Sequence, residues 1–335
     1  GMGIATDPTA NVEDFDKLMT DLHDTTAAQE TGEMTFGEAV KQLRQDMVSR
    51  IDGSGDAGMM TGLHIFDSHY GLHAGDLVIF AGRTSQGKST LATTIARNMA
   101  LMGTPSAYYS LEMGAKQLTA RIMARDTMLS SSRMLYDKMN EGELARFDQQ
   151  AATMQQLPIY YDDKSKTSFR RLTTSIRAMV RKHAIRIAFI DYLQILANGS
   201  GDNREQLIGD MARDLKRLAV ELNICIVAIS QLSRAKDKPE PTLMEMRGSG
   251  QIEEACDTAV LVYRPFVYGI ERYKDSTLTY GTAQLTIAKG RNIGLAQEIV
   301  SFNGELTYFY DRDEKQVTVQ AQSSGWSGND EQLPF

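Results

Sequence analysis

The amino-acid sequence predicts an α/β fold, in which a mostly parallel sheet is flanked by helices and extended by C-terminal β-hairpins. Short apolar runs alternate with amphipathic stretches between residues 63 and 302. Parallel strands covered on both faces have few polar interruptions, so this alternation is typical of an α/β domain. A glycine-rich string at residues 82–89 lies between the first apolar run and the first amphipathic stretch. After residue 258 the pattern becomes that of β-hairpins.

Each element is predicted from the period of its apolar residues. The expected parallel strands are the apolar runs 76–81, 106–111, 158–161, 185–190 and 224–230. The expected helices have apolar residues three or four positions apart, and they are 89–102, 115–127, 141–155, 168–183 and 204–222. The expected hairpin strands are 258–263, 283–288, 297–302 and 306–311.

The two ends of the chain differ in composition from the part between them. Residues 1–34 carry eight acidic side chains and one basic one, which accounts for the whole net charge of −7. We expect them to form a disordered acidic tail. The string Thr35-Phe-Gly-Glu38 has the form of a helix-capping box and predicts an isolated amphipathic helix, which a flexible glycine-rich linker follows to residue 58. The main domain is expected over 59–312 and a disordered tail over 313–335.

The composition excludes several classes of protein. No run approaches the roughly 20 apolar residues of a membrane span. Cys225 and Cys256 are the only cysteines, which excludes a disulfide framework and a cysteine-rich zinc site. We therefore expect a reduced, cytoplasmic protein without a membrane partner. Residues 35–335 balance 35 basic against 35 acidic side chains, so the acidic total does not exclude nucleic-acid binding.

The glycine-rich string predicts a phosphate site. Gly82-Arg-Thr-Ser-Gln-Gly-Lys-Ser89 fits the pattern G-x4-G-K-[ST], and it lies between a predicted strand and a predicted helix, as this chemistry requires. Backbone N–H groups of such a loop cradle phosphates, the Lys88 ammonium reaches the β- and γ-phosphates, and the Ser89 hydroxyl ligates Mg²⁺. The alternative is a plain glycine turn. The predicted nucleotide-binding residues are Gly82, Arg83, Thr84, Ser85, Gln86, Gly87, Lys88, Ser89 and Thr90.

Three polar residues end other predicted strands. Asp191 follows four apolar residues and predicts the second magnesium partner, the alternative being a carboxylate that caps the next turn. Glu112 follows the strand 106–111 and could polarise an attacking water, the alternative being a surface carboxylate. Gln231 ends the strand 224–230, where a glutamine can contact the γ-phosphate and report its loss. All three belong at the edge of the sheet that carries the phosphate loop.

With these motifs in order, residues 60–312 resemble the RecA-like motor domain of the DnaB family of replicative helicases. The resemblance rests on Ser110-Leu-Glu-Met113, Ile190-Asp-Tyr-Leu-Gln194, Gln231-Leu-Ser-Arg234, Arg247-Gly-Ser-Gly250 and Lys289-Gly-Arg-Asn292, together with the phosphate loop. It implies a homo-oligomer of six subunits, which hydrolyses ATP with Mg²⁺ at subunit interfaces and moves 5′→3′ along single-stranded DNA.

The resemblance also implies a role for each matching residue. Lys88 and Ser89 would bind nucleotide and magnesium, Asp191 would be the Walker B acid, and Glu112 would activate water. Arg291, with Lys289, would be the finger that acts on a neighbouring subunit's nucleotide. The predicted DNA-binding residues are Arg234, Arg247, Ser249 and Gly250, which would contact phosphates without reading sequence. The alternative for these residues is a solvated basic loop.

Other features place the chain among the relatives. Only some thirty residues precede the helix 35–51, which corresponds to the family's linker helix, so the resemblance is to a collarless or phage-like or mobile-element-like member. The chain ends Asp330-Glu-Gln-Leu-Pro-Phe335, similar to the acidic Pro-Phe tip of single-stranded-DNA-binding proteins. Candidate partners are therefore a primase, a loader or proteins that read such tips.

Two other functions are open on the sequence. One is a RecA-like ATPase that depends on DNA but does not unwind it, such as a recombinase-like or loading factor. The other is a RecA-like switch ATPase that does not act on DNA.

Overall fold

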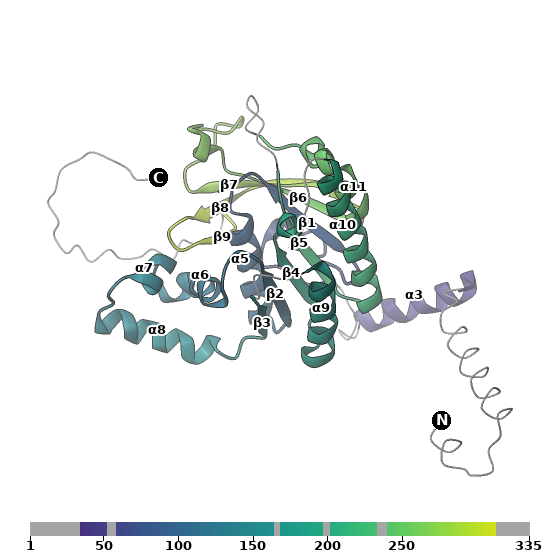
Figure 1. The fold of residues 1–335 in the computed structure, drawn as a ribbon, viewed down its shortest axis with the longest axis horizontal. Helices are drawn as coiled ribbons and strands as arrows, with labels where there is room; N and C mark the ends of the chain where they lie inside the picture. The colour runs from purple at the N-terminus through teal and green to yellow at the C-terminus, as the bar shows by residue number, and fades with distance from the viewer. Residues whose placement is uncertain (1–33, 52–57, 164–167, 197–201, 233–239, 313–335) are drawn as a thin grey trace, which may run out of the picture. The chain divides into compact units, whose positions relative to one another are not determined.

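The computed structural model describes residues 34–51, 58–163, 168–196, 202–232 and 240–312 (Figure 1). The chain divides into two units, which are residues 1–57 and 58–335. The predicted tails over 1–34 and 313–335 lie almost wholly outside the described residues.

The first unit contains helix α3 (Phe36–Ile51), which agrees with the predicted helix over 35–51. Its start is fixed by the predicted capping box. The Glu38 carboxylate accepts hydrogen bonds from the Thr35 backbone N–H at 2.8 Å and from the Thr35 hydroxyl at 2.7 Å. Apolar side chains at the helical period, Phe36, Val40 and Leu43 among them, are exposed.

The second unit is built around one sheet of nine strands in the described residues. The strands are β1 (Leu77–Gly82), β2 (Ser106–Ser110), β3 (Ile159–Asp162), β4 (Ile187–Asp191), β5 (Cys225–Gln231), β6 (Thr258–Tyr263), β7 (Thr282–Gly290), β8 (Ala296–Asn303) and β9 (Tyr308–Tyr310). Their order is β3-β2-β4-β5-β1-β6-β7-β8-β9. The pairs from β3 to β6 are parallel and those from β6 to β9 are antiparallel, which confirms the predicted fold class.

Helices join the strands and cover the sheet. They are α4 (His64–Asp67), α5 (Lys88–Leu101), α6 (Ala115–Thr127), α7 (Ser131–Tyr136), α8 (Glu141–Met154), α9 (Phe169–His183), α10 (Asp202–Leu222) and α11 (Gly250–Ala255), with the 3₁₀ helices η1 (Leu193–Ile195), η2 (Leu243–Ser249) and η3 (Pro265–Tyr268). The sequence predicted the five long ones to within two residues. It missed α4, α7, α11 and the 3₁₀ helices, because segments of three to seven residues are too short to show a helical period.

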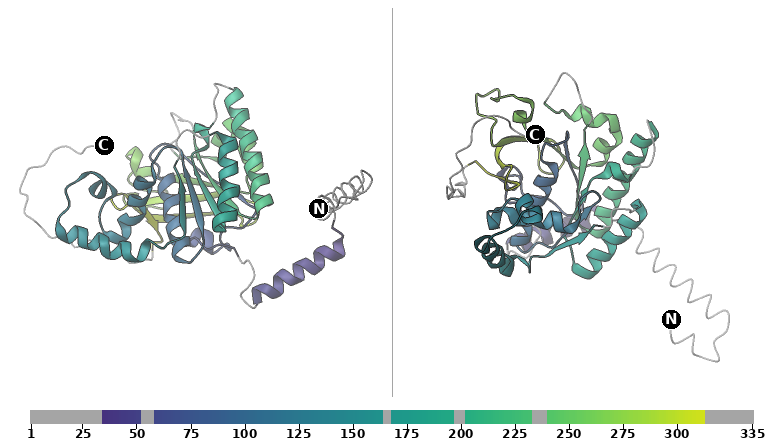
Figure 2. Two further views of the ribbon diagram at one scale, coloured as in Figure 1. Left: turned by 60° about the horizontal axis from the view of Figure 1, so that its bottom comes forward. Right: turned by 60° about the vertical axis from the view of Figure 1, so that its left-hand side comes forward.

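The sheet separates two apolar cores. Helices α4 and α5 pack on one face, against residues such as Phe80 and Phe189. Helices α9, α10 and α11 pack on the other, against the alternate residues, such as Ile79 and Ile190. Figure 2 shows helices on both sides of the strands. Because each central strand is buried on both faces, its sequence is a continuous apolar run rather than an alternating one.

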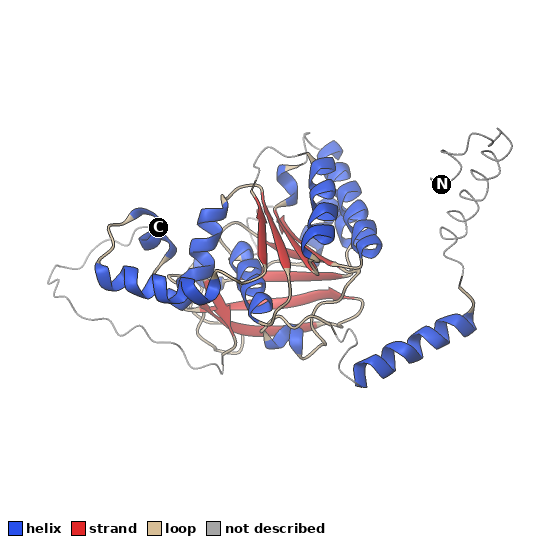
Figure 3. Cartoon of the chain, turned by 90° about the horizontal axis from the view of Figure 1, so that it is seen from below, coloured by secondary structure: helices blue, strands red, loops and turns tan. Residues whose placement is uncertain are grey.

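Helices α6, α7 and α8 form a smaller group beside the sheet (Figure 3). They enclose a separate core around Ile122, Met123 and Met154. None of the described helices is both long enough and apolar enough to cross a membrane.

Candidate active site

The phosphate loop connects β1 to α5 at the carboxyl edge of the parallel strands. Gly87 caps α5 with a φ of +94°, which favours glycine, and a Cβ at this position would lie 3.1 Å from the Phe309 ring, which is a tight contact. Ser85 also has a positive φ, of +63°. The loop thus curls around the first turn of α5, where unpaired backbone N–H groups and the helix dipole favour an anion.

Lys88 lies across this loop. Its ammonium donates a hydrogen bond to the Arg83 carbonyl at 2.9 Å. Burial lowers the pKa of Lys88 to about 8, although the negative charges of Asp191 and Glu112 oppose the shift. A phosphate placed against this ammonium would stabilise its charged form, so the lysine is set to gain favourable electrostatics from an anionic ligand.

Asp191 ends β4 beside the same loop and is 4% exposed. Its carboxylate is hydrogen-bonded to the Ser89 side chain, and the Tyr108 hydroxyl donates to it at 3.2 Å. Burial raises the pKa of Asp191, while these two hydrogen bonds lower it. A buried carboxylate paired with a hydroxyl fits Mg²⁺, which takes oxygen ligands and is held by few protein side chains together with substrate phosphates.

Glu112 and Gln231 lie at this edge too. Glu112 is exposed and follows Leu111, whose N–H donates to the Asp191 carbonyl at 2.9 Å. The Gln231 amide donates to the Thr84 hydroxyl at 2.9 Å. The structure therefore brings together Lys88, Ser89, Asp191, Glu112 and Gln231, which the sequence placed at one edge from separate motifs.

Three other predicted nucleotide-binding residues have side chains that point into the protein instead. The Arg83 guanidinium, 5% exposed, donates to both carboxylate oxygens of Glu245 at 3.0 and 3.1 Å. The Gln86 side chain accepts a hydrogen bond from the Arg264 backbone N–H at 2.6 Å, and Thr90 is buried. These side chains pack behind the loop. Arg83 attaches the loop to η2, and Gln86 attaches it to the residue that follows β6.

Sequence reasoning assigned no role to Tyr108 or Arg264. Tyr108 reaches Asp191 from the neighbouring strand β2. Arg264 donates to the Ser85 carbonyl at 3.3 Å, and its guanidinium lies 3.8 Å from the centre of the Phe302 ring. Neither residue lies near the loop in sequence, so only the order of the strands could have indicated them.

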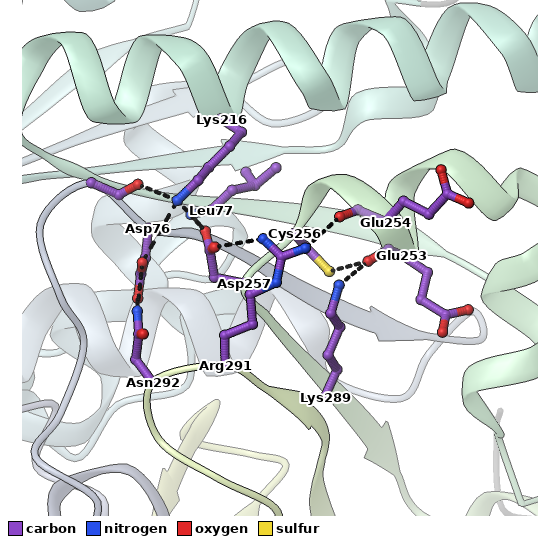
Figure 4. A network of polar contacts seen from close by, with 11 residues as sticks. Asp76, Leu77, Lys216, Glu253, Glu254, Cys256, Asp257, Lys289, Arg291 and Asn292 are labelled. Carbon is purple, nitrogen blue, oxygen red and sulfur yellow. Dashed lines mark hydrogen bonds and ion pairs between the residues drawn. The ribbon is translucent and has the colours of Figure 1, made fainter. Parts of the chain in front are cut away.

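Lys289 and Arg291 lie at the opposite edge of the sheet from the phosphate loop. Figure 4 shows their side chains beside Glu253, Glu254 and Asp257. Lys289 pairs with Ala259 near the start of β6, and Arg291 follows the end of β7. The register places them level with the amino end of β1, whereas the phosphate loop begins at its carboxyl end. The five steps from Leu77 to Gly82 span about 16 Å. An arginine side chain at one end does not reach the loop of its own chain at the other.

The predicted DNA-binding residues are described only in part. Arg234 lies outside the described residues. Arg247 and Ser249 belong to η2, and Gly250 begins α11. Their side chains are outside the described set, so their placement is known for the backbone alone.

Residues 58–311 match the family described as the DnaB-like helicase C-terminal domain. The replicative DNA helicase DnaB of Rickettsia prowazekii (strain Madrid E) is 32% identical over 280 residues, which cover 75% of this chain and 58% of that protein. The chain spans about half the length of the curated relatives it matches.

Two solved structures are similar in fold. One, described as an ATPase domain, has a TM-score of 0.73 at 27% identity, and the match covers 83% of this chain and 99% of that one. The other is described as a DnaB-like replicative helicase and its interactions with primase. It has a TM-score of 0.71 at 26% identity, and the match covers 89% of this chain and 76% of that one.

Proposed function

The chain belongs to the DnaB-like helicase C-terminal domain family, and from this premise we propose that it is an ATP-driven replicative DNA helicase. In this proposal six copies form a ring that moves 5′→3′ along single-stranded DNA. The observation that carries the proposal is the hydrogen-bonded pair of Ser89 and Asp191 beside the half-buried Lys88. This arrangement provides one cation for the phosphates of ATP and two oxygen ligands for magnesium.

Each residue of the carboxyl edge has a role in the proposed hydrolysis. Lys88 and the loop N–H groups hold the phosphates, and Ser89 and Asp191 would hold Mg²⁺, which neutralises developing charge when bound. Glu112 orients and polarises the attacking water. Gln231, which is bonded to Thr84, senses the γ-phosphate at the start of the segment that leads to Arg234.

In this proposal the opposite edge of the sheet supplies a further cation for the hydrolysis. Lys289 and Arg291 are too far from their own phosphate loop, so we propose that they act on the nucleotide of a neighbouring copy. A cation there stabilises the charge of the transferred phosphoryl group. The distance between the two edges of one sheet supports this division between copies.

The proposed nucleic-acid partner is single-stranded DNA, contacted at its phosphates by Arg234, Arg247, Ser249 and Gly250. Binding is then non-specific and weakens with salt. A primase is the proposed protein partner, because one similar structure is described as a DnaB-like replicative helicase and its interactions with primase. A loader and proteins that read acidic Pro-Phe tips are the other candidates from the sequence.

Two assays on the full chain test the proposal. We expect ATP hydrolysis to rise with single-stranded DNA and a fork with a 5′ tail to be unwound, and Lys88→Ala to abolish both. DNA-stimulated hydrolysis without unwinding would favour the DNA-dependent ATPase. Hydrolysis that ignores DNA would favour the switch ATPase.

A further inference from the structure

Asp257 lies in the short connection between α11 and β6 and is 3% exposed. One carboxylate oxygen, Oδ2, accepts a hydrogen bond from the Leu77 backbone N–H at 2.8 Å and forms an ion pair with the Lys216 ammonium at 2.7 Å. The other, Oδ1, lies 3.3 Å from an Nη atom of Arg291 (Figure 4). The two oxygens therefore have different partners. Oδ2 joins the start of β1 to α10, and Oδ1 faces the arginine.

The main chain beside Asp257 holds the same cations. The second Nη of Arg291 donates to the Glu254 carbonyl at 3.0 Å, and the Lys289 ammonium donates to the Glu253 carbonyl. The backbone N–H of Arg291 donates to the Asp257 carbonyl at 2.9 Å. Residues 253–257 thus fix both basic residues, at the end of α11 where helix carbonyls favour positive charge.

The contact with Asp257 leaves the Arg291 side chain accessible to a ligand from outside its own copy. The Arg291 side chain is 52% exposed, whereas Asp257 is buried. A guanidinium carries five N–H donors in a fixed fork, and its contacts to Asp257 and Glu254 are made through separate Nη atoms. A planar group held at two points keeps its orientation, and about half of the Arg291 side-chain surface stays exposed.

We propose that Asp257 is a positioning residue for Arg291, whose guanidinium it orients toward the nucleotide of the neighbouring copy. The inference rests on the proposed function, in which Arg291 acts between copies. It adds a residue that touches neither ATP nor DNA. Loss of the carboxylate charge weakens one of the two contacts that hold the Arg291 guanidinium. The Glu254 carbonyl is then its main anchor, and the side chain samples several rotamers.

The central test is Asp257→Asn, which keeps the side-chain volume, removes the charge and replaces one of the two acceptor oxygens by an NH₂ donor. We expect DNA-stimulated kcat to fall at least tenfold, while the KM for ATP and the binding of a fluorescent nucleotide change less than about twofold, because the phosphate loop lies at the other edge. Asp76→Asn is the matched control. Asp76 is buried in the same network and contacts Lys216 and Asn292, but not Arg291 in the described contacts, so its kcat should stay within about twofold of the parent's.

Mixed oligomers separate positioning from mere structural support. Asp257→Asn copies keep an intact phosphate loop, and Lys88→Ala copies keep an intact Arg291. In a 1:1 random mixture, about a quarter of the interfaces combine the two intact halves, so activity should return toward that fraction. Arg291→Ala mixed with Lys88→Ala is the reference pair and should recover equally.

Three results would overturn the proposal. Recovery by the reference pair but not by Asp257→Asn would show that Asp257 supports its own copy's site. Recovery by neither pair would contradict a site shared between copies, and with it the proposed action of Arg291 on a neighbour's nucleotide. If Asp257→Asn does not fold, Asp257→Glu keeps the buried charge and moves it by one methylene. A normal kcat in that variant would contradict a positioning role, and a reduced kcat with normal nucleotide binding would support it.

Discussion

The two edges of the parallel sheet carry different functional groups. At the carboxyl edge, the half-buried Lys88 lies near Asp191 and Glu112, at a loop that can receive an anion. At the amino edge, Lys289 and Arg291 are held by carbonyls and by Asp257, and Arg291 is half exposed. In the proposed function, one copy therefore contains both a nucleotide-binding loop and the cation that acts on a neighbour's nucleotide, separated by the length of a strand.

The largest effect should come from the amino edge. Arg291→Ala removes the proposed charge from the transition state, so DNA-stimulated turnover should fall on the order of 10³- to 10⁵-fold. Nucleotide binding, followed by fluorescence titration, should stay near the parent value, because the phosphate loop is untouched. Normal turnover by this variant would break the comparison.

Lys88→Ala tests the carboxyl edge. It removes the cation that faces the phosphates, so we expect turnover to fall on the order of 10³-fold and nucleotide affinity to fall with it. Thermal unfolding without nucleotide should occur at or above the parent temperature, since the substitution removes a half-buried ammonium whose pKa is lowered by desolvation. Nucleotide affinity equal to the parent's would refute the role of Lys88.

The pKa of Lys88 gives the carboxyl edge its own pH dependence. Free Lys88 loses its proton near pH 8, and a bound triphosphate raises that pKa, so binding takes up a proton above pH 8. The affinity for a non-hydrolysable ATP analogue should be level below pH 8 and fall by up to about tenfold per pH unit above it. Arg291→Ala should keep this profile and Lys88→Arg should lose it. The same profile in Lys88→Arg would assign the titration to another group.

Tyr108→Phe should have the smallest effect. It removes one hydrogen bond to Asp191 and raises the pKa of that carboxyl slightly further. A net contribution of about 1 kcal/mol predicts a roughly fivefold rise in the magnesium concentration that gives half-maximal turnover. Tyr109→Phe, on the same strand, is the control, because Tyr109 lies away from Asp191 and packs in the opposite core. Equal effects of both substitutions would show a general loss of packing instead.

The residues that meet at the carboxyl edge could largely be predicted from the sequence, because each belongs to a short local pattern. Each strand is an apolar run with a polar residue at its end, and parallel strands bring these ends together without further information. The phosphate loop carries its whole pattern within eight residues. What the sequence did not supply was the support from elsewhere in the chain, such as Glu245 behind Arg83.

The contacts at the amino edge could not be predicted from the sequence, because they join residues that are far apart in the chain. The bond from Leu77 to Asp257 spans 180 positions, and the pair of Asn292 and Asp76 spans 216. The sequence identified Lys289 and Arg291 through a family resemblance alone. Neither the buried Asp257 nor Lys216 belongs to a pattern that distinguishes it from an ordinary charged residue.

The separation of cradle and cation has a further consequence for how copies would associate. In a closed circle every cradle has a cation opposite it, so complete sites are as many as copies. In an open row the first cradle and the last cation have no counterpart, and one site is always missing. An isolated copy has one phosphate loop and one cation but no complete site.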